Sequence, residues 1–232
     1  MNIRMRFAKT GNVKFIGHLD IMRYFQKAFR RAGVDMTYSK GYSPHPLLSF
    51  AAPLGVGITS EGEYLDLRVN TTESSAVMID KINSVMSSGL RIVSYKLMPD
   101  DAKTAMSLIS GADYLVFDKE DAENKVFTEN VDKFNEYLLQ DEIIITKDSK
   151  SGPKDIDIRP YIYKTEISKD GLRMVVSQGS EVNIRPEFVL ESFFKFAGLD
   201  YNEYRYQIHR FDLFTGDKDN FVSLDTMGED IN

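Results

Sequence analysis

The chain has 232 residues, of which 42% are hydrophobic and 28% charged, with no cysteine and no tryptophan. This composition is ordinary for a globular protein and excludes collagen-like, coiled-coil and disordered chains. The missing cysteines exclude disulfide frameworks, thiolate zinc sites, cysteine nucleophiles and iron–sulfur ligation by this chain. No run of about 18 apolar residues is present, and the first residues lack the apolar centre of a signal peptide, so we expect a cytoplasmic protein without a membrane segment.

The net charge is −6, but the charge is unevenly distributed. Residues 1–50 contain nine basic and two acidic side chains, a net charge of +7, whereas the other 182 residues contain 20 basic and 33 acidic ones. A molecule polarised in this way presents a basic face that concentrates anions. The alternative is a solvated basic surface paired with acids from the rest of the chain, and we favour anion binding.

The first half of the chain alternates strand and helix patterns. Ile3, Met5 and Phe7 alternate with arginines, which indicates a strand with one buried face. Apolar residues at helical spacing then predict an amphipathic helix that ends at Gly33. The expected elements are a strand at 3–9, a helix at 18–32, strands at 34–38 and 64–70, a helix at 76–86 and a strand at 90–97. This order predicts a ferredoxin-like β-α-β-β-α-β domain over residues 1–100.

The second half repeats the rhythm after a junction at 99–110. The expected elements are a strand at 112–118, a helix at 127–138, strands at 142–146, 155–167 and 172–177, a helix at 186–197 and a strand at 204–214. We therefore predict an α+β protein with two tandem ferredoxin-like domains, the second over 106–215. The acidic, turn-rich residues 216–232 are expected to be a frayed tail.

The segment 39–57, SKGYSPHPLLSFAAPLGVG, carries three prolines, three glycines and one histidine. A connection of this length without secondary structure is uncommon in a compact domain and is often functional. Its polar residues suit phosphate or base contacts, and an aromatic side chain there can stack on an unpaired base. The alternative is a hairpin whose prolines only stiffen an exposed loop. The candidates in this segment are Lys40, Tyr42, Ser43, His45 and Ser49.

Other candidate binding residues are basic. Those in the first half, for RNA or a protein partner, are Arg4, Arg6, His18, Arg23, Lys27, Arg30 and Arg31; those in the second half, as anion sites or structural pairs, are Arg159, Arg185 and Arg210. His18 begins a helix, where packing and capping are at least as good an interpretation as ligand binding. Asp155 and Asp157 share a predicted strand face with Arg159, which indicates a solvated or salt-bridged face more than a metal site. We expect no metal and no cofactor.

Four segments carry a resemblance to a known family: residues 4–33 (RMRFAKTGNVKFIGHLDIMRYFQKAFRRAG), 38–57, 155–162 (DIDIRPYI) and 185–190 (RPEFVL). They resemble an uncharacterised family of radical-SAM-linked bacterial proteins, encoded beside or fused to a radical SAM protein with a cobalamin-binding-type domain. The family is often found near a ribonuclease and ribosomal proteins. The resemblance implies a radical SAM partner on a separate chain, because that chemistry needs three cluster thiolates and this chain has none.

Three functions remain open at this point. The first is a non-catalytic RNA-binding adaptor that presents rRNA or tRNA to the radical SAM partner. The second is a protein–protein docking module for that partner. The third is a metal-independent RNA endonuclease with His45 as acid or base, prompted by a similarity in plan to CRISPR RNA-processing endonucleases. No catalytic constellation stands out, so we favour the non-enzymatic adaptor.

Overall fold

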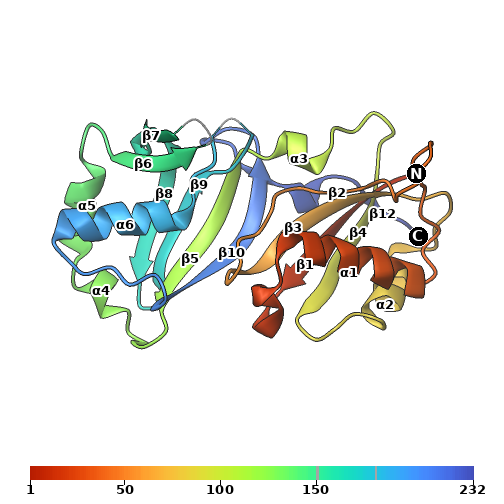
Figure 1. The fold of residues 1–232 in the computed structure, drawn as a ribbon, viewed down its shortest axis with the longest axis horizontal. Coiled ribbons are helices and arrows are strands. Elements are labelled where there is room, and N and C mark those ends of the chain that lie inside the picture. Colours follow the sequence, from red (N-terminus) through yellow and green to blue (C-terminus); the bar gives the residue numbers. More distant parts are fainter. Residues whose placement is uncertain (150–151, 181) are drawn as a thin grey trace. The chain divides into compact units, whose positions relative to one another are not determined.

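The computed structural model of the protein describes residues 1–149, 152–180 and 182–232. The chain is a mixed α+β protein dominated by antiparallel β-sheet, with few helices (Figure 1). It divides into two compact units, Met1–Ser110 with Arg210–Asn232 (unit 1) and Gly111–His209 (unit 2). In sequence, unit 2 is thus inserted between the two parts of unit 1. No helix in the described ranges has the length and apolar character needed to span a bilayer.

Unit 1 is a sheet with helices on one face. Its elements are β1 (Asn2–Lys9), the 3-10 helix η1 (Gly11–Phe15), α1 (His18–Arg31), β2 (Leu48–Phe50), β3 (Thr59–Arg68), α2 (Ser75–Asn83), β4 (Leu90–Met98), α3 (Ala105–Leu108), the second half of β10 (Tyr206–Thr215), β11 (Val222–Ser223), the 3-10 helix η3 (Leu224–Thr226) and β12 (Glu229–Asp230). The strand order is β12-β4-β1-β3, with β2 and β10 both against β3.

The core of unit 1 follows from the alternation that predicts β1. Ile3, Met5 and Phe7 are buried on one face of the sheet, where the apolar sides of α1 and α2 cover them. The rings of Phe7 and Phe25 pack edge to face with centroids 4.8 Å apart. The predicted strand at 3–9 and helix at 18–32 are therefore confirmed, and the helix ends before Gly33, whose φ is +72°.

The opposite face of this sheet is polar, and residues 222–230 cover it. Leu224 is fully buried. Asp225 Oδ2 lies 3.5 Å from Arg6 Nη1, and the backbone oxygen of Asp225 accepts a hydrogen bond from Lys96 Nζ. β12 pairs with β4, and β11 pairs with β10. The stretch 216–232 was expected to be frayed. It is instead held here because its acidic and apolar groups complement the basic outer face of β1 and β4.

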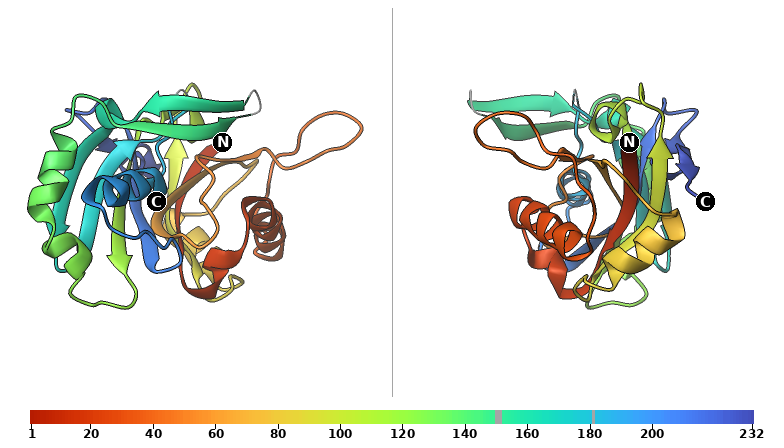
Figure 2. Two further views of the ribbon diagram at one scale, coloured as in Figure 1. Left: turned by 60° about the vertical axis from the view of Figure 1, so that its left-hand side comes forward. Right: turned by 90° about the vertical axis from the view of Figure 1, so that its right-hand side faces the viewer.

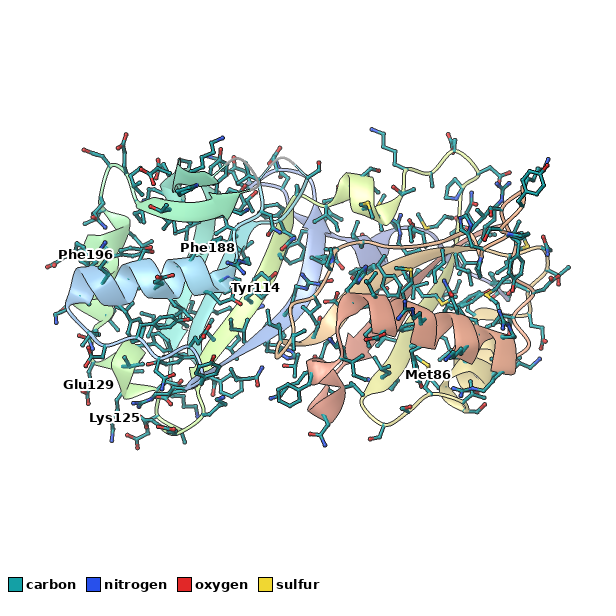
Figure 3. The ribbon with its side chains drawn as sticks, viewed as in Figure 1. Met86, Tyr114, Lys125, Glu129, Phe188 and Phe196 are labelled. Carbon is teal, nitrogen blue, oxygen red and sulfur yellow. The ribbon has the colours of Figure 1, made fainter. Side chains whose placement is uncertain are left out.

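Unit 2 has four strands of the large sheet and its own aromatic core. Its elements are β5 (Gly111–Asp118), α4 (Lys125–Thr128), α5 (Val131–Leu138), the hairpin β6 (Ile144–Ser149) and β7 (Gly152–Asp157), the 3-10 helix η2 (Arg159–Tyr161), β8 (Ile162–Ser168), β9 (Gly171–Ser177), α6 (Pro186–Ala197) and the first half of β10. The strand order is β10-β5-β9-β8. Phe188 and Phe196 mark the two ends of α6, and Tyr114 lies on β5 (Figure 3).

Two predicted strands differ from the structure. Residues 34–38 form only isolated bridges, Met36 with Val69 and Tyr38 with Pro46, and the strand beside β3 is β2. The predicted strand 155–167 is broken at η2, because Pro160 has no N–H to give to a ladder. The expected division at 106–215 also differs, since residues from Arg210 onward belong to unit 1.

Candidate functional site

The outer face of α1 carries a row of exposed basic side chains, Arg23, Lys27, Arg30 and Arg31. Arg23 makes a 3.2 Å ion pair with Asp20 on the same helix. Arg31 donates to the backbone oxygen of Val85 at 2.8 Å. The side chains of Lys27 and Arg30 make no hydrogen bond or ion pair to any of the described residues. We call these four residues the α1 row; it points away from the core because the opposite side of the helix is apolar.

The loop that follows α1 projects from unit 1 (Figure 2). Its base is closed at Ser39 and His45: Ser39 N donates to His45 O at 2.8 Å, and His45 N donates to Ser39 Oγ at 3.1 Å. Residues 40–45, which include the candidates Lys40 and Ser43, are exposed, and the side chain of Tyr42 is fully exposed at the tip. We call residues 39–45 the projecting loop. It holds an aromatic ring in solvent, where no packing explains it.

His45 does not face an acid–base partner within the described residues. Its Nδ1 lies 2.9 Å from Ser39 Oγ and 3.3 Å from Ser43 O, so the ring is oriented by the loop itself. The partners considered from sequence, Lys40 and Tyr42, make no hydrogen bond to it. The geometry therefore supplies a fixed polar group and no general-base arrangement.

A cavity of about 360 Å³ opens at the base of the projecting loop. It brings together the predicted candidates Arg4, His45 and Ser49 with Arg68 and Lys103. A second, more open hollow of about 740 Å³ is lined in part by Lys40, and it shares Leu47 and Arg68 with the first. We call the 360 Å³ cavity the loop-base pocket.

Sequence reasoning missed Arg68 and Lys103. Arg68 had a usable signal, because alternation with the inward-facing Leu67 and Val69 places it on the outer face of its strand. Lys103 lies in a junction without periodicity, so only the tertiary fold brings it to the pocket.

Arg4 and Arg6 on β1 both pair with other groups of unit 1. Arg4 is buried and makes a bidentate pair with Asp66, with Nε–Oδ1 at 2.8 Å and Nη2–Oδ2 at 3.1 Å. Arg6 donates to the backbone oxygens of Glu61 and Phe211 and faces Asp225. Neither guanidinium is available as a surface contact for a long polyanion.

Arg210 belongs to a buried charge cluster in unit 1, and the half-buried His18 lies beside it. Arg210 pairs with Glu63, with Nε–Oε1 at 2.7 Å, and Lys9 is buried nearby with its Nζ 2.8 Å from Ile16 O. Burial lowers the pKa of Lys9, an effect that Glu63 opposes and Arg210 reinforces. The His18 ring packs edge to face on Phe50 at 5.3 Å; burial lowers its pKa, Glu63 raises it and Lys9 lowers it further. An anion at Arg210 would have to displace Glu63.

The second-half candidates do not converge. Arg159 lies in η2 and donates through Nε to Leu138 O at 2.5 Å. Arg185 is exposed, with its guanidinium 4.3 Å above the ring of Phe188. Asp157 accepts hydrogen bonds from the Ile143 and Arg159 amides. Among the described residues, no three His, Asp or Glu side chains lie together as a metal site would need.

Comparison with known proteins identifies a family. A sequence model of a bacterial family, described as an uncharacterized protein conserved in bacteria (DUF2344), matches residues 2–186. The match covers nearly all of the first part of unit 1, including the α1 row, the projecting loop and the loop-base pocket. No curated protein matches the chain.

Proposed function

The chain belongs to the DUF2344 family of uncharacterized bacterial proteins, and we propose that it is a non-catalytic RNA-binding adaptor for a radical SAM enzyme. The observation that carries the RNA part is the α1 row together with the fully exposed Tyr42 of the projecting loop. Basic side chains on one helix face suit phosphates, and an exposed ring suits an unpaired base. The sequence resemblance supports the radical SAM partner and rRNA or tRNA as target, and the absence of cysteine agrees with a partner that supplies the cluster. A cytoplasmic location is part of the same proposal.

We also propose that each unit has a ferredoxin-like plan. In unit 1, the chain order β1, α1, β2, β3, α2, β4 combined with the sheet order β4-β1-β3-β2 supports this. In unit 2, the corresponding order is β10-β5-β9-β8, with the β6–β7 hairpin as an addition. Such a plan leaves function to the attached loops and helix faces.

A salt titration tests RNA binding. Binding of the full chain to total tRNA and to rRNA fragments is measured between about 50 and 300 mM salt. Phosphate contacts weaken steeply over this range. Charge reversal at Arg23, Lys27 and Arg30 should lower the salt slope by about 2, because each lost phosphate contact removes roughly 0.7–0.9. The matched control reverses three exposed lysines of unit 2: Lys119, Lys169 and Lys195.

Tyr42→Ala tests the loop. It should weaken binding to single-stranded RNA by about 1–3 kcal/mol, the cost of losing one stacked base, without changing the salt slope. Tyr204→Ala is the control, because Tyr204 is an exposed tyrosine of unit 2. Equal effects of the two substitutions would contradict a specific role for the loop.

The salt titration, together with copurification and a cleavage assay on the same RNAs, distinguishes the other two functions. A flat salt response, with copurification of the radical SAM partner after nuclease treatment, would replace RNA binding by protein docking as the proposed role. If the wild type cleaves RNA and His45→Ala does not, the proposed role becomes that of an endonuclease.

A further inference from the structure

The loop-base pocket has the size and lining of a small-ligand site. Its volume of about 360 Å³ falls in the range of roughly 300–1,000 Å³ in which proteins usually bind small molecules. Leu47, Met98 and Ala102 contribute an apolar wall, and Asn2 and Ser49 contribute polar groups. This combination suits a ligand that carries both a ring and a charged group.

The charge of the lining is positive. Arg4, Arg68 and Lys103 face the pocket against one carboxylate, Asp66. Arg4 and Asp66 neutralise each other in their bidentate pair. In the described ranges, neither the guanidinium of Arg68 nor the ammonium of Lys103 makes a hydrogen bond or ion pair. Two positive charges are thus left uncompensated at one pocket.

The buried Arg4 adds a preorganised donor. Asp66 holds its Nε and Nη2, and Nη2 also donates to the backbone oxygen of Lys103 at 3.0 Å. The remaining group, Nη1, is 3.6 Å from the thioether sulfur of Met227, a weak acceptor. An anion oxygen that reached Nη1 would be a stronger acceptor than this sulfur, and Asp66 already orders the side chain.

We propose that the loop-base pocket binds a nucleoside monophosphate, either free or as one unstacked nucleotide of an RNA strand. The phosphate, with a charge of about −1.5 to −2 when it is a monoester, matches the two uncompensated cations. The base lies against the apolar wall. This inference is independent of RNA binding by the α1 row, because charge reversal on α1 leaves the pocket lining unchanged.

The test is calorimetric titration of the full chain with AMP, GMP, CMP and UMP, and separately with adenosine, uridine and inorganic phosphate. At least one monophosphate should bind with a Kd below about 1 mM, and its nucleoside and inorganic phosphate should each bind at least about tenfold more weakly. Arg68→Ala/Lys103→Ala should weaken monophosphate binding by about tenfold or more. Arg91→Ala/Lys119→Ala, which removes the same charge at exposed sites elsewhere, should change it less than about twofold.

A single-stranded oligonucleotide as competitor identifies the source of the ligand. Displacement of the mononucleotide by the oligonucleotide would support an RNA nucleotide in the pocket, and its failure to displace would support a free nucleotide. Thermal unfolding of each variant shows that the fold is intact. The proposal is overturned if no monophosphate binds at millimolar concentration, if a nucleoside or inorganic phosphate binds as tightly as the monophosphate, or if the control variant loses as much.

Discussion

The buried cluster around Glu63 offers a quantitative test of how unit 1 is stabilised. The side chains of Glu63 and Arg210 are 3% and 1% exposed, and Lys9 is equally buried. Glu63→Gln would leave two cations in the core without the carboxylate that faces them. At an effective dielectric constant near 20, opposite charges about 4 Å apart attract by about 4 kcal/mol. Removing one partner of a buried pair costs about 3–5 kcal/mol, so we expect a loss of that size.

The assay is urea denaturation followed by circular dichroism, with the free energy of unfolding extrapolated to water. Asp20→Asn is the control, because its pair with Arg23 is mostly exposed and should contribute less than about 0.5 kcal/mol. Glu63→Gln/Arg210→Met removes one stranded cation and should be more stable than Glu63→Gln alone. A loss below about 1 kcal/mol in the single variant, or a double variant less stable than the single one, would refute the electrostatic argument.

The other predictions concern pH, glycine and the C-terminal segment. The folded-state pKa of His18 is lowered, so the unfolded chain binds more protons than the folded chain below about pH 6.5. The free energy of unfolding should therefore fall as the pH drops through that value. His18→Phe should reduce this fall when it is measured by urea denaturation at several pH values. Gly171→Ala should destabilise the protein by more than about 3 kcal/mol, and Gly41→Ala by about 1 kcal/mol. Both glycines have a φ above +120°, but only at Gly171 would an added Cβ meet a backbone oxygen, that of Val116, at 2.1 Å. A chain lacking 222–232 should unfold at lower urea, because it exposes the polar face that this segment covers; an unchanged midpoint would contradict that role.

The sequence predicts elements well where periodicity is strong. β1, α1, β5 and α6 lie close to their expected ranges, because each has one apolar face and a clear end such as Gly33 or Gly198. The failures lie where distant contacts decide. Residues 34–38 have strand-like composition, but β3 has its partner strand at Leu48–Phe50. Likewise, residues 216–232 have no apolar periodicity, and their position depends on a few contacts such as Leu224 and Asp225.

The candidate site was predicted unevenly for the same reason. Exposure on a helix face follows from 3.6-residue spacing, so the α1 row was visible in the sequence. Whether a basic residue is paired depends on partners far along the chain, as for Arg4 with Asp66 and Arg210 with Glu63. Local patterns carry no information on such pairs. The loop-base pocket joins β1, β3, the loop and the 99–104 junction, and none of these segments signals it alone.

The insertion of unit 2 within unit 1 has a consequence for folding during synthesis. Residues 111–209 leave the ribosome before Arg210, so unit 2 can fold while unit 1 still lacks its half of β10, β11 and β12. Until Arg210 emerges, Glu63 has no guanidinium partner, and the polar face of β1 and β4 stays uncovered. The nascent chain therefore carries one folded unit and, along the part of β3 that β2 does not cover, one open sheet edge. A pause in translation after residue 209 has left the ribosome and before Arg210 has would expose that edge to chaperones or to another chain, and resumed synthesis would close it.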